Sequence, residues 1–239
     1  MDARELGQHI SQRFDSDLEA LRSKVLKTGG VVERQLADAL KALADEDSAL
    51  GEEIITRDNE VNALELEIDE DCALILARRQ PVASDLRLLI SIIKVITDLE
   101  RMGDEAVRIA RMAVRHAERS QHKRPPSTVR HLGHHVRGML HDALDAFARF
   151  DLDMAAQVVA EDRSVDREYE SLTRELITFM MEDPRAIPHA LDVLFSARAL
   201  ERIGDRACNI CEYVIYYVRG KDVRHEGLEV LQRAAKRDP

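Results

Sequence analysis

The chain has 239 residues, with 35 Lys and Arg against 45 Asp and Glu, which gives a formal net charge of −10. An acidic surface repels nucleic-acid phosphates, so we expect no nucleic-acid partner. Aromatic residues make up only 4% of the chain and tryptophan is absent. This composition is typical of helical bundles with aliphatic cores rather than of β-sheets.

The three cysteines, Cys72, Cys208 and Cys211, do not form the even-numbered framework of a secreted disulfide protein. The N-terminus lacks the basic stretch and apolar core of an export signal. The longest apolar run, residues 88–96, is much shorter than the about 20 residues that span a bilayer. We therefore expect a soluble, cytoplasmic protein.

Proline and glycine breaks divide the chain into six long predicted helices. The expected helices are residues 5–44, 48–79, 83–118, 127–150, 152–182 and 187–219. Between the third and fourth, residues 119–126 read RSQHKRPP. Two prolines exclude helix continuation there, so this segment is the predicted linker between two halves.

The two halves resemble each other at three places that occur in the same order. DLERMGDEAVRIA at 98–110 aligns with ALERIGDRACNIC at 199–211, DNEVN at 58–62 with DRSVD at 162–166, and Pro81 with Pro184. Three matches in one order indicate an internal duplication of a three-helix unit.

In each half, the helix with the LER[IM]GD sequence carries one glutamate within its apolar seam. Apolar or small residues recur at alternating steps of three and four around Glu100 and around Glu201. A carboxylate in such a seam needs a cation or hydrogen-bond donors. Asp104 and Asp205 follow four residues later, so each lies beside its glutamate on the same helix edge.

These paired carboxylates are candidates either for cation ligands or for ion pairs. Two carboxylates one turn apart can converge on a cation that offsets their repulsion. Arg101 and Arg202 directly follow the glutamates and could neutralise them without metal. The preceding helices repeat the spacing with Asp58, Asn62, Asp162 and Asp166. The many acids nearby, Glu65 among them, favour a solvated face for this second set.

Two further sets of possible ligands have simpler interpretations. Cys208 and Cys211 form a CxxC sequence but lie on the apolar seam, so we expect core residues rather than a zinc or redox site. His131, His134 and His135 have helical spacing that could gather a metal, but a solvated face near a helix start is favoured.

Gly103 and Gly204 interrupt good helices and are expected to permit close packing. They also occupy the positions at which a Glu-x-x-His motif would place histidine. A carboxylate-bridged di-iron enzyme is therefore disfavoured. A helical scaffold without a ligand remains the other alternative.

The two LER[IM]GD copies, with RQPVASDLRLLI at 79–90 and MEDPRAI at 181–187, closely resemble the PhoU family of accessory regulators of bacterial phosphate uptake. The resemblance covers nearly the whole chain. It implies an all-α fold of two tandem homologous three-helix bundles. We expect these in residues 1–120 and 121–220, followed by a polar tail at 221–239.

The resemblance also implies a non-enzymatic function. A member of this family is expected to contact the cytoplasmic ATPase side of the phosphate-specific ABC transporter and the sensor histidine kinase of the phosphate regulon. It would keep the starvation response off when phosphate is plentiful. A homodimer is the expected assembly.

Some members carry multinuclear metal sites on the bundle surfaces, so divalent ions, with iron or zinc as candidates, are the implied cofactors. Carried over to this sequence, the ligand positions are Glu100, Asp104, Glu201, Asp205, Asp58, Asn62, Asp162, Asp166, Asn209 and Glu212. Arg108 and Arg206 stand where the family often has Asn and His. They are expected to weaken metal binding, particularly in the first bundle.

Overall fold

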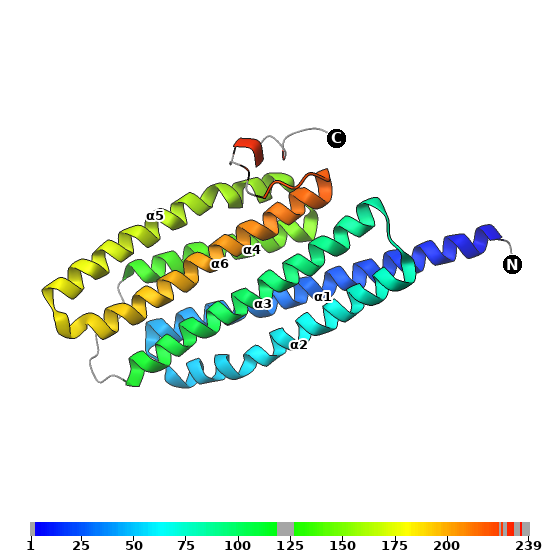
Figure 1. Cartoon of the computed structure of the whole chain (residues 1–239). Helices are drawn as coiled ribbons and strands as arrows, with labels where there is room; N and C mark the ends of the chain where they lie inside the picture. The colour runs from blue at the N-terminus through cyan, green and yellow to red at the C-terminus, as the bar shows by residue number, and fades with distance from the viewer. Residues whose placement is uncertain (1–2, 119–126, 225, 227–228, 232–234, 236–239) are drawn as a thin grey trace.

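The structure is a computed structural model that describes residues 3–118, 127–224, 226, 229–231 and 235 (Figure 1). Its elements are α1 (Ala3–Asp45), α2 (Ser48–Arg79), α3 (Ala83–Glu118), α4 (Ser127–Arg149), α5 (Leu152–Glu182), the short 3₁₀ helix η1 (Pro184–Ala186) and α6 (Ile187–Arg219). The predicted all-α class is confirmed, and every predicted helix end lies within two residues of the observed one. The predicted linker, 119–126, lies outside the described residues.

Side-chain caps define where the second helix of each bundle begins. The Asp47 side chain accepts a hydrogen bond from the Leu50 N–H at 3.0 Å, and the Asp151 side chain accepts bonds from the Asp153 and Met154 N–H groups. These bonds satisfy amides that have no partner within the helix. Two homologous helices therefore begin in the same way.

Each half of the chain folds into a bundle of three long helices, and the two bundles lie side by side (Figure 1). The first contains α1, α2 and α3, and the second contains α4, α5 and α6. Between the bundles, α3 packs against α6 and α1 packs against α4. The helices that carry LER[IM]GD, α3 and α6, thus meet at the centre of the molecule.

Two glycines allow α1 and α4 to approach closely. A Cβ on Gly133 would lie 2.4 Å from Cδ2 of Leu40, and a Cβ on Gly29 would lie 2.5 Å from Cδ2 of Leu144. Each leucine therefore fills the space left by a missing side chain on the opposite helix. The two glycines are 104 positions apart in the sequence, and so are the two leucines. Each repeat therefore makes the same leucine–glycine contact with the other. A pseudo-twofold axis relates the two repeats.

Several described residues of the segment expected to be a polar C-terminal tail pack against the second bundle's α6 or lie in the core. Val223, Leu231 and Ala235 are buried. Arg219 of α6 donates a hydrogen bond from Nη2 to the Ala235 carbonyl oxygen at 2.9 Å.

None of the described helices is both long enough and apolar enough to cross a membrane.

We expect Gly133→Ala to destabilise the protein by about 1–3 kcal/mol, because the new methyl group must displace Leu40. In a Leu40→Ala background the same change should instead stabilise, since alanine is the better helix former by about 1 kcal/mol. Urea denaturation of the four proteins in this double-mutant cycle measures both effects.

Gly138→Ala is the matched control, because a Cβ there meets nothing within 4 Å. It should stabilise in either background. Equal effects of Gly133→Ala with and without Leu40 would show that the close approach does not hold.

Candidate functional site

The first candidate site lies where α2 packs against α3. Helix α3 supplies Glu100, which is half-buried, and Asp104, which is exposed. Helix α2 supplies Asp58, whose Oδ1 lies 3.3 Å from the position that a Cβ on Gly103 would occupy. Glycine at 103 therefore allows the α2 carboxylate to approach the turn between the two α3 carboxylates. Gln35 of α1 holds Asp58 in place by donating from Nε2 to Oδ1 at 2.9 Å.

The carboxylates of this first cluster repel one another. Burial raises the pKa of Glu100, and the negative charges of Asp104, Glu65 and Asp58 raise it further. Burial also raises the pKa of Glu65, with added repulsion from Asp69 and Asp104. A raised pKa means that the charged form is disfavoured in the folded protein. The first cluster therefore has more negative charge than its protein neighbours neutralise.

Glu65 is a residue that sequence reasoning missed. The many acids of this region, Glu65 among them, predict a solvated face, but Glu65 is half-buried and close enough to Glu100 to raise the pKa of Glu100. The available signal was its spacing, because residues 58, 62 and 65 follow steps of four and three along one helix face.

The second candidate site lies where α5 packs against α6. Helix α6 supplies Glu201, which is buried, and Asp205, while α5 supplies Asp162 and Asp166. Burial is the main cause that raises the pKa of Glu201, of Asp205 and of Asp162, and in each case a neighbouring aspartate raises it further. The structure thus brings these four predicted residues together.

This second cluster is partly neutralised by one arginine. Nη1 of Arg198 lies 2.5 Å from Oε1 of Glu201, and its guanidinium lies 5.8 Å from the centre of the Tyr169 ring. The other oxygen of Glu201, Oε2, is buried and has no hydrogen-bond partner among the described residues. A buried acceptor without a partner carries a desolvation cost that a bound cation or donor would remove.

The structure places the three remaining predicted ligands in different surroundings. Asn62 is exposed on α2. Asn209 turns towards the first bundle, where its Nδ2 lies 3.4 Å from Oδ2 of Asp98. Burial raises the pKa of Glu212 to about 7; the charge of Arg224 lowers it, and those of Asp222, Asp98 and Asp162 raise it. Asn209 therefore faces α3, whereas Glu212 lies near the C-terminal segment and within electrostatic reach of Asp162, so their role as ligands stays a prediction.

A polar network between α3 and α6 was also missed from the sequence. The buried Asp98 accepts a hydrogen bond from the Tyr213 hydroxyl at 3.1 Å, and Arg202 donates from Nη1 to Oε1 of Glu105 at 3.1 Å. Burial raises the pKa of Asp98, while its donors lower it. The signal was a mismatch within the repeat, since Asp98 aligns with Ala199.

The two arginines that depart from the family pattern take part in other contacts. Nη1 of Arg108 lies 3.5 Å from Oε2 of Glu105, and Nε of Arg206 lies 3.9 Å from Oδ1 of Asp98. In the second bundle Arg198 ion-pairs with the candidate ligand Glu201, and the charge of Arg206 lowers the pKa of Asp205. Arg108 thus pairs with Glu105, and the expected weakening of metal binding stays a prediction.

The other possible ligand sets do not converge. Cys208 and Cys211 are buried, and burial raises the pKa of both thiols, as expected of core residues. His131 and His134 are exposed, whereas Nδ1 of His135 lies 2.9 Å from Oε1 of Glu168 on α5.

Within the part of the chain that the structure describes, no three His, Cys, Asp or Glu side chains are close enough together to enclose a metal ion as they stand. The donor chemistry of the two clusters nevertheless fits a divalent cation. Their donors are carboxylate oxygens, which suit magnesium, manganese and iron. A cation would also relieve the repulsion that raises the pKa of Glu100 and of Asp205.

These features define a class of protein: a tandem helical repeat in which each three-helix bundle presents carboxylates where its second and third helices meet. The PhoU domain matches residues 25–113 and 129–214, which is one copy for each bundle. The chain belongs to the PhoU family.

Similar proteins span nearly the whole chain. The phosphate-specific transport system accessory protein PhoU homolog of Pseudomonas putida is 54% identical, with 94% of this chain and 88% of that protein covered. The phosphate-specific transport system accessory protein PhoU of Escherichia coli is 49% identical, with 98% and 96% covered.

Two crystal structures share the fold. PhoU from Pseudomonas aeruginosa superposes with a TM-score of 0.84 at 53% identity, covering 87% of this chain and 100% of that one. The phosphate transport system regulatory protein PhoU from Streptococcus pneumoniae gives a TM-score of 0.82 at 33% identity, with 88% and 99% covered.

We expect Glu100→Gln to stabilise the chelator-treated protein at pH 8 by a few tenths to about 1 kcal/mol, since the amide removes a repelled charge. The raised pKa means that the folded state binds more protons than the unfolded state above the ordinary value of 4.5. The wild type therefore loses stability as pH rises through that range. At pH 4 the advantage of the variant should vanish.

Thermal unfolding at both pH values measures this difference. Glu60→Gln, on the exposed face of α2, is the matched control and should change little. A Glu100→Gln variant that is less stable than wild type at pH 8 would contradict the repulsion.

Proposed function

We propose that this chain is a negative regulator of the phosphate-starvation response that acts through the phosphate-specific ABC transporter. The observation that carries the proposal is the match of both bundles to the PhoU domain, together with near full-length identity to phosphate-specific transport system accessory proteins. The protein would work at the cytoplasmic ATPase side of the transporter and contact the sensor histidine kinase.

Two features of the bundles support a linking role. They share one architecture, yet they differ in surface chemistry: the first cluster contains Glu65, whereas the second contains Tyr169 and Arg198 at its edge. Two similar but distinct faces suit two different partners. A homodimer, which we also propose, would present each face twice.

We further propose that each bundle binds divalent metal through its carboxylates. Asp58, Glu65, Glu100 and Asp104 would hold it in the first bundle, and Asp162, Asp166, Glu201 and Asp205 in the second. The support is the oxygen-only donor set, the mutual repulsion within each cluster and the unpartnered Glu201 Oε2. This donor set favours manganese, magnesium or iron over zinc. The ion would supply charge neutralisation and a rigid link between neighbouring helices.

Catalysis is not part of the proposal. A di-iron carboxylate enzyme of the bundle type needs a histidine three positions after its glutamate. That position is Gly103 in α3 and Gly204 in α6, and the small residue there is what allows Asp58 to approach in the first bundle.

Deletion of the gene should make a phosphate-starvation reporter active in phosphate-rich medium, because the inhibitory link to the kinase is lost. Wild-type complementation should silence the reporter again. A Glu100→Ala/Glu201→Ala variant should fail to silence it, while Glu60→Ala, matched in residue type, should succeed. Immunoblotting confirms equal protein levels. A reporter that stays silent in the deletion strain would contradict the regulatory role.

A further inference from the structure

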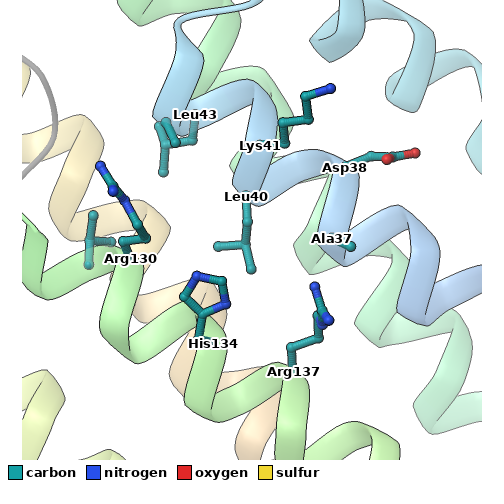
Figure 2. Close-up of a pocket in the computed structure, with 10 residues that line it drawn as sticks. Ala37, Asp38, Leu40, Lys41, Leu43, Arg130, His134 and Arg137 are labelled. Atoms are coloured by element: carbon teal, nitrogen blue, oxygen red, sulfur yellow. The ribbon is translucent and has the colours of Figure 1, made fainter.

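A groove runs between the C-terminal half of α1 and the N-terminal half of α4, and none of the candidate carboxylate ligands is among its lining residues. Its cavity has a volume of about 370 Å³. The floor is apolar and includes Leu40, Leu43 and Val129. Figure 2 shows Leu40 at the centre, between the two helices. Because Leu40 packs over Gly133, the contact that joins the bundles also forms the floor of the groove.

The rim of this groove is basic. Arg130, His134 and Arg137 project from one face of α4, and Lys41 comes from α1 (Figure 2). All four side chains are exposed, and none makes a hydrogen bond or ion pair with another residue that the structure describes. The acid at the rim, Asp38, is held instead by Arg57 of α2 at 2.7 Å. A protein with a net charge of −10 thus concentrates unpaired cations around an apolar cavity.

The repeat provides an internal control for what helix packing requires. The pseudo-twofold relation of 104 positions defines an equivalent groove at the opposite ends of α1 and α4. There the α1 positions equivalent to Arg130, His134 and Arg137 are Leu26, Gly30 and Glu33. The α4 position equivalent to Lys41 is Asp145. In that groove Glu33 pairs with His141 at 3.3 Å and Asp145 with Arg149 at 2.9 Å. Packing α1 against α4 therefore needs no basic rim.

We propose that the basic groove, formed by Arg130, His134, Arg137 and Lys41 over Leu40, is a docking surface for an acidic amphipathic helix of a protein partner. Arg130 and Arg137 are seven residues apart, or about 10 Å along the helix axis. Carboxylates at i, i+4 and i+7 of a helix lying along the groove repeat that spacing. An aliphatic side chain between them would fill the cavity over Leu40.

The chemistry favours this occupant over a small anion. Arginine binds carboxylates through two parallel hydrogen bonds, which gives orientation as well as charge. Inorganic phosphate would use the rim but leave the apolar floor uncovered, whereas an amphipathic helix uses both. This surface goes beyond the regulatory role proposed above and does not depend on it, since it uses none of the carboxylate-cluster residues.

Fluorescence anisotropy with a labelled 14-residue helical peptide tests the proposal, using full-length protein treated with chelator. The peptide carries leucines on one face, flanked by glutamates at i, i+4 and i+7. We expect saturable binding that weakens as salt rises. Arg130→Glu/Arg137→Glu should weaken it at least tenfold. The charge-matched control Arg111→Glu/Arg185→Glu, at two exposed positions on other elements, should change it less than twofold.

Two further variants separate the apolar contribution from charge. Ala37→Trp fills the groove without changing charge and should also weaken binding at least tenfold. A peptide with serine in place of leucine should bind as poorly. Circular dichroism checks that each protein remains folded, and Arg130→Gln/Arg137→Gln provides a milder version of the charge change.

The proposal is overturned if the wild type shows no saturable binding, or if the charge-matched control loses as much affinity as the groove variant. The proposal is also overturned if Ala37→Trp binds the leucine peptide as tightly as wild type does and wild type binds the serine peptide equally tightly. Charge alone would then explain the interaction. Displacement of the peptide by inorganic phosphate, beyond that by chloride at equal ionic strength, would assign the groove to a small anion instead.

Discussion

Repulsion between carboxylates on the central helices is the physical constraint on which the rest of this structure depends. Glu100 and Glu201 occupy positions in an apolar seam, and each has an aspartate one turn further along the same helix edge. Burial and like charge both disfavour ionisation there. Such an arrangement costs stability in the absence of a counter-charge. The same arrangement stands in both repeats, and this is why we propose that it serves a bound cation rather than packing.

The close approach of α1 to α4 determines how the two sites are presented. The reciprocal leucine–glycine contacts orient the bundles around a pseudo-twofold axis, so that α3 and α6 meet at the centre. The network around Asp98 and the Arg202–Glu105 ion pair then fix α3 against α6. As a result, the first carboxylate cluster faces α2 and the second faces α5. The same close contact leaves the basic groove open at one end of the α1–α4 pair.

Most of the fold could be predicted from the sequence, because proline breaks and long apolar periodicity define helices without knowledge of their partners. The glutamates within the seams could be predicted for the same reason. What the sequence could not specify is which helix faces which. Asn209 has the spacing of a ligand, but its face of α6 is turned towards Asp98. Glu65 lies in an acid-rich stretch that is typical of a solvated helix face, but the packing of α2 places it beside Glu100. Periodicity within one helix cannot specify the rotation of its neighbour.

The measurement that tests the central claim most directly is calorimetric titration of manganese(II) into chelator-stripped protein. We predict saturable binding at each bundle, lost in the first bundle with Glu100→Gln/Asp104→Asn and in the second with Glu201→Gln/Asp205→Asn, while the other site of each variant remains. Binding should release protons below neutral pH, since carboxylates with a raised pKa must ionise. Absence of saturable binding, or equal binding by wild type and a protein with all four substitutions, would contradict the account.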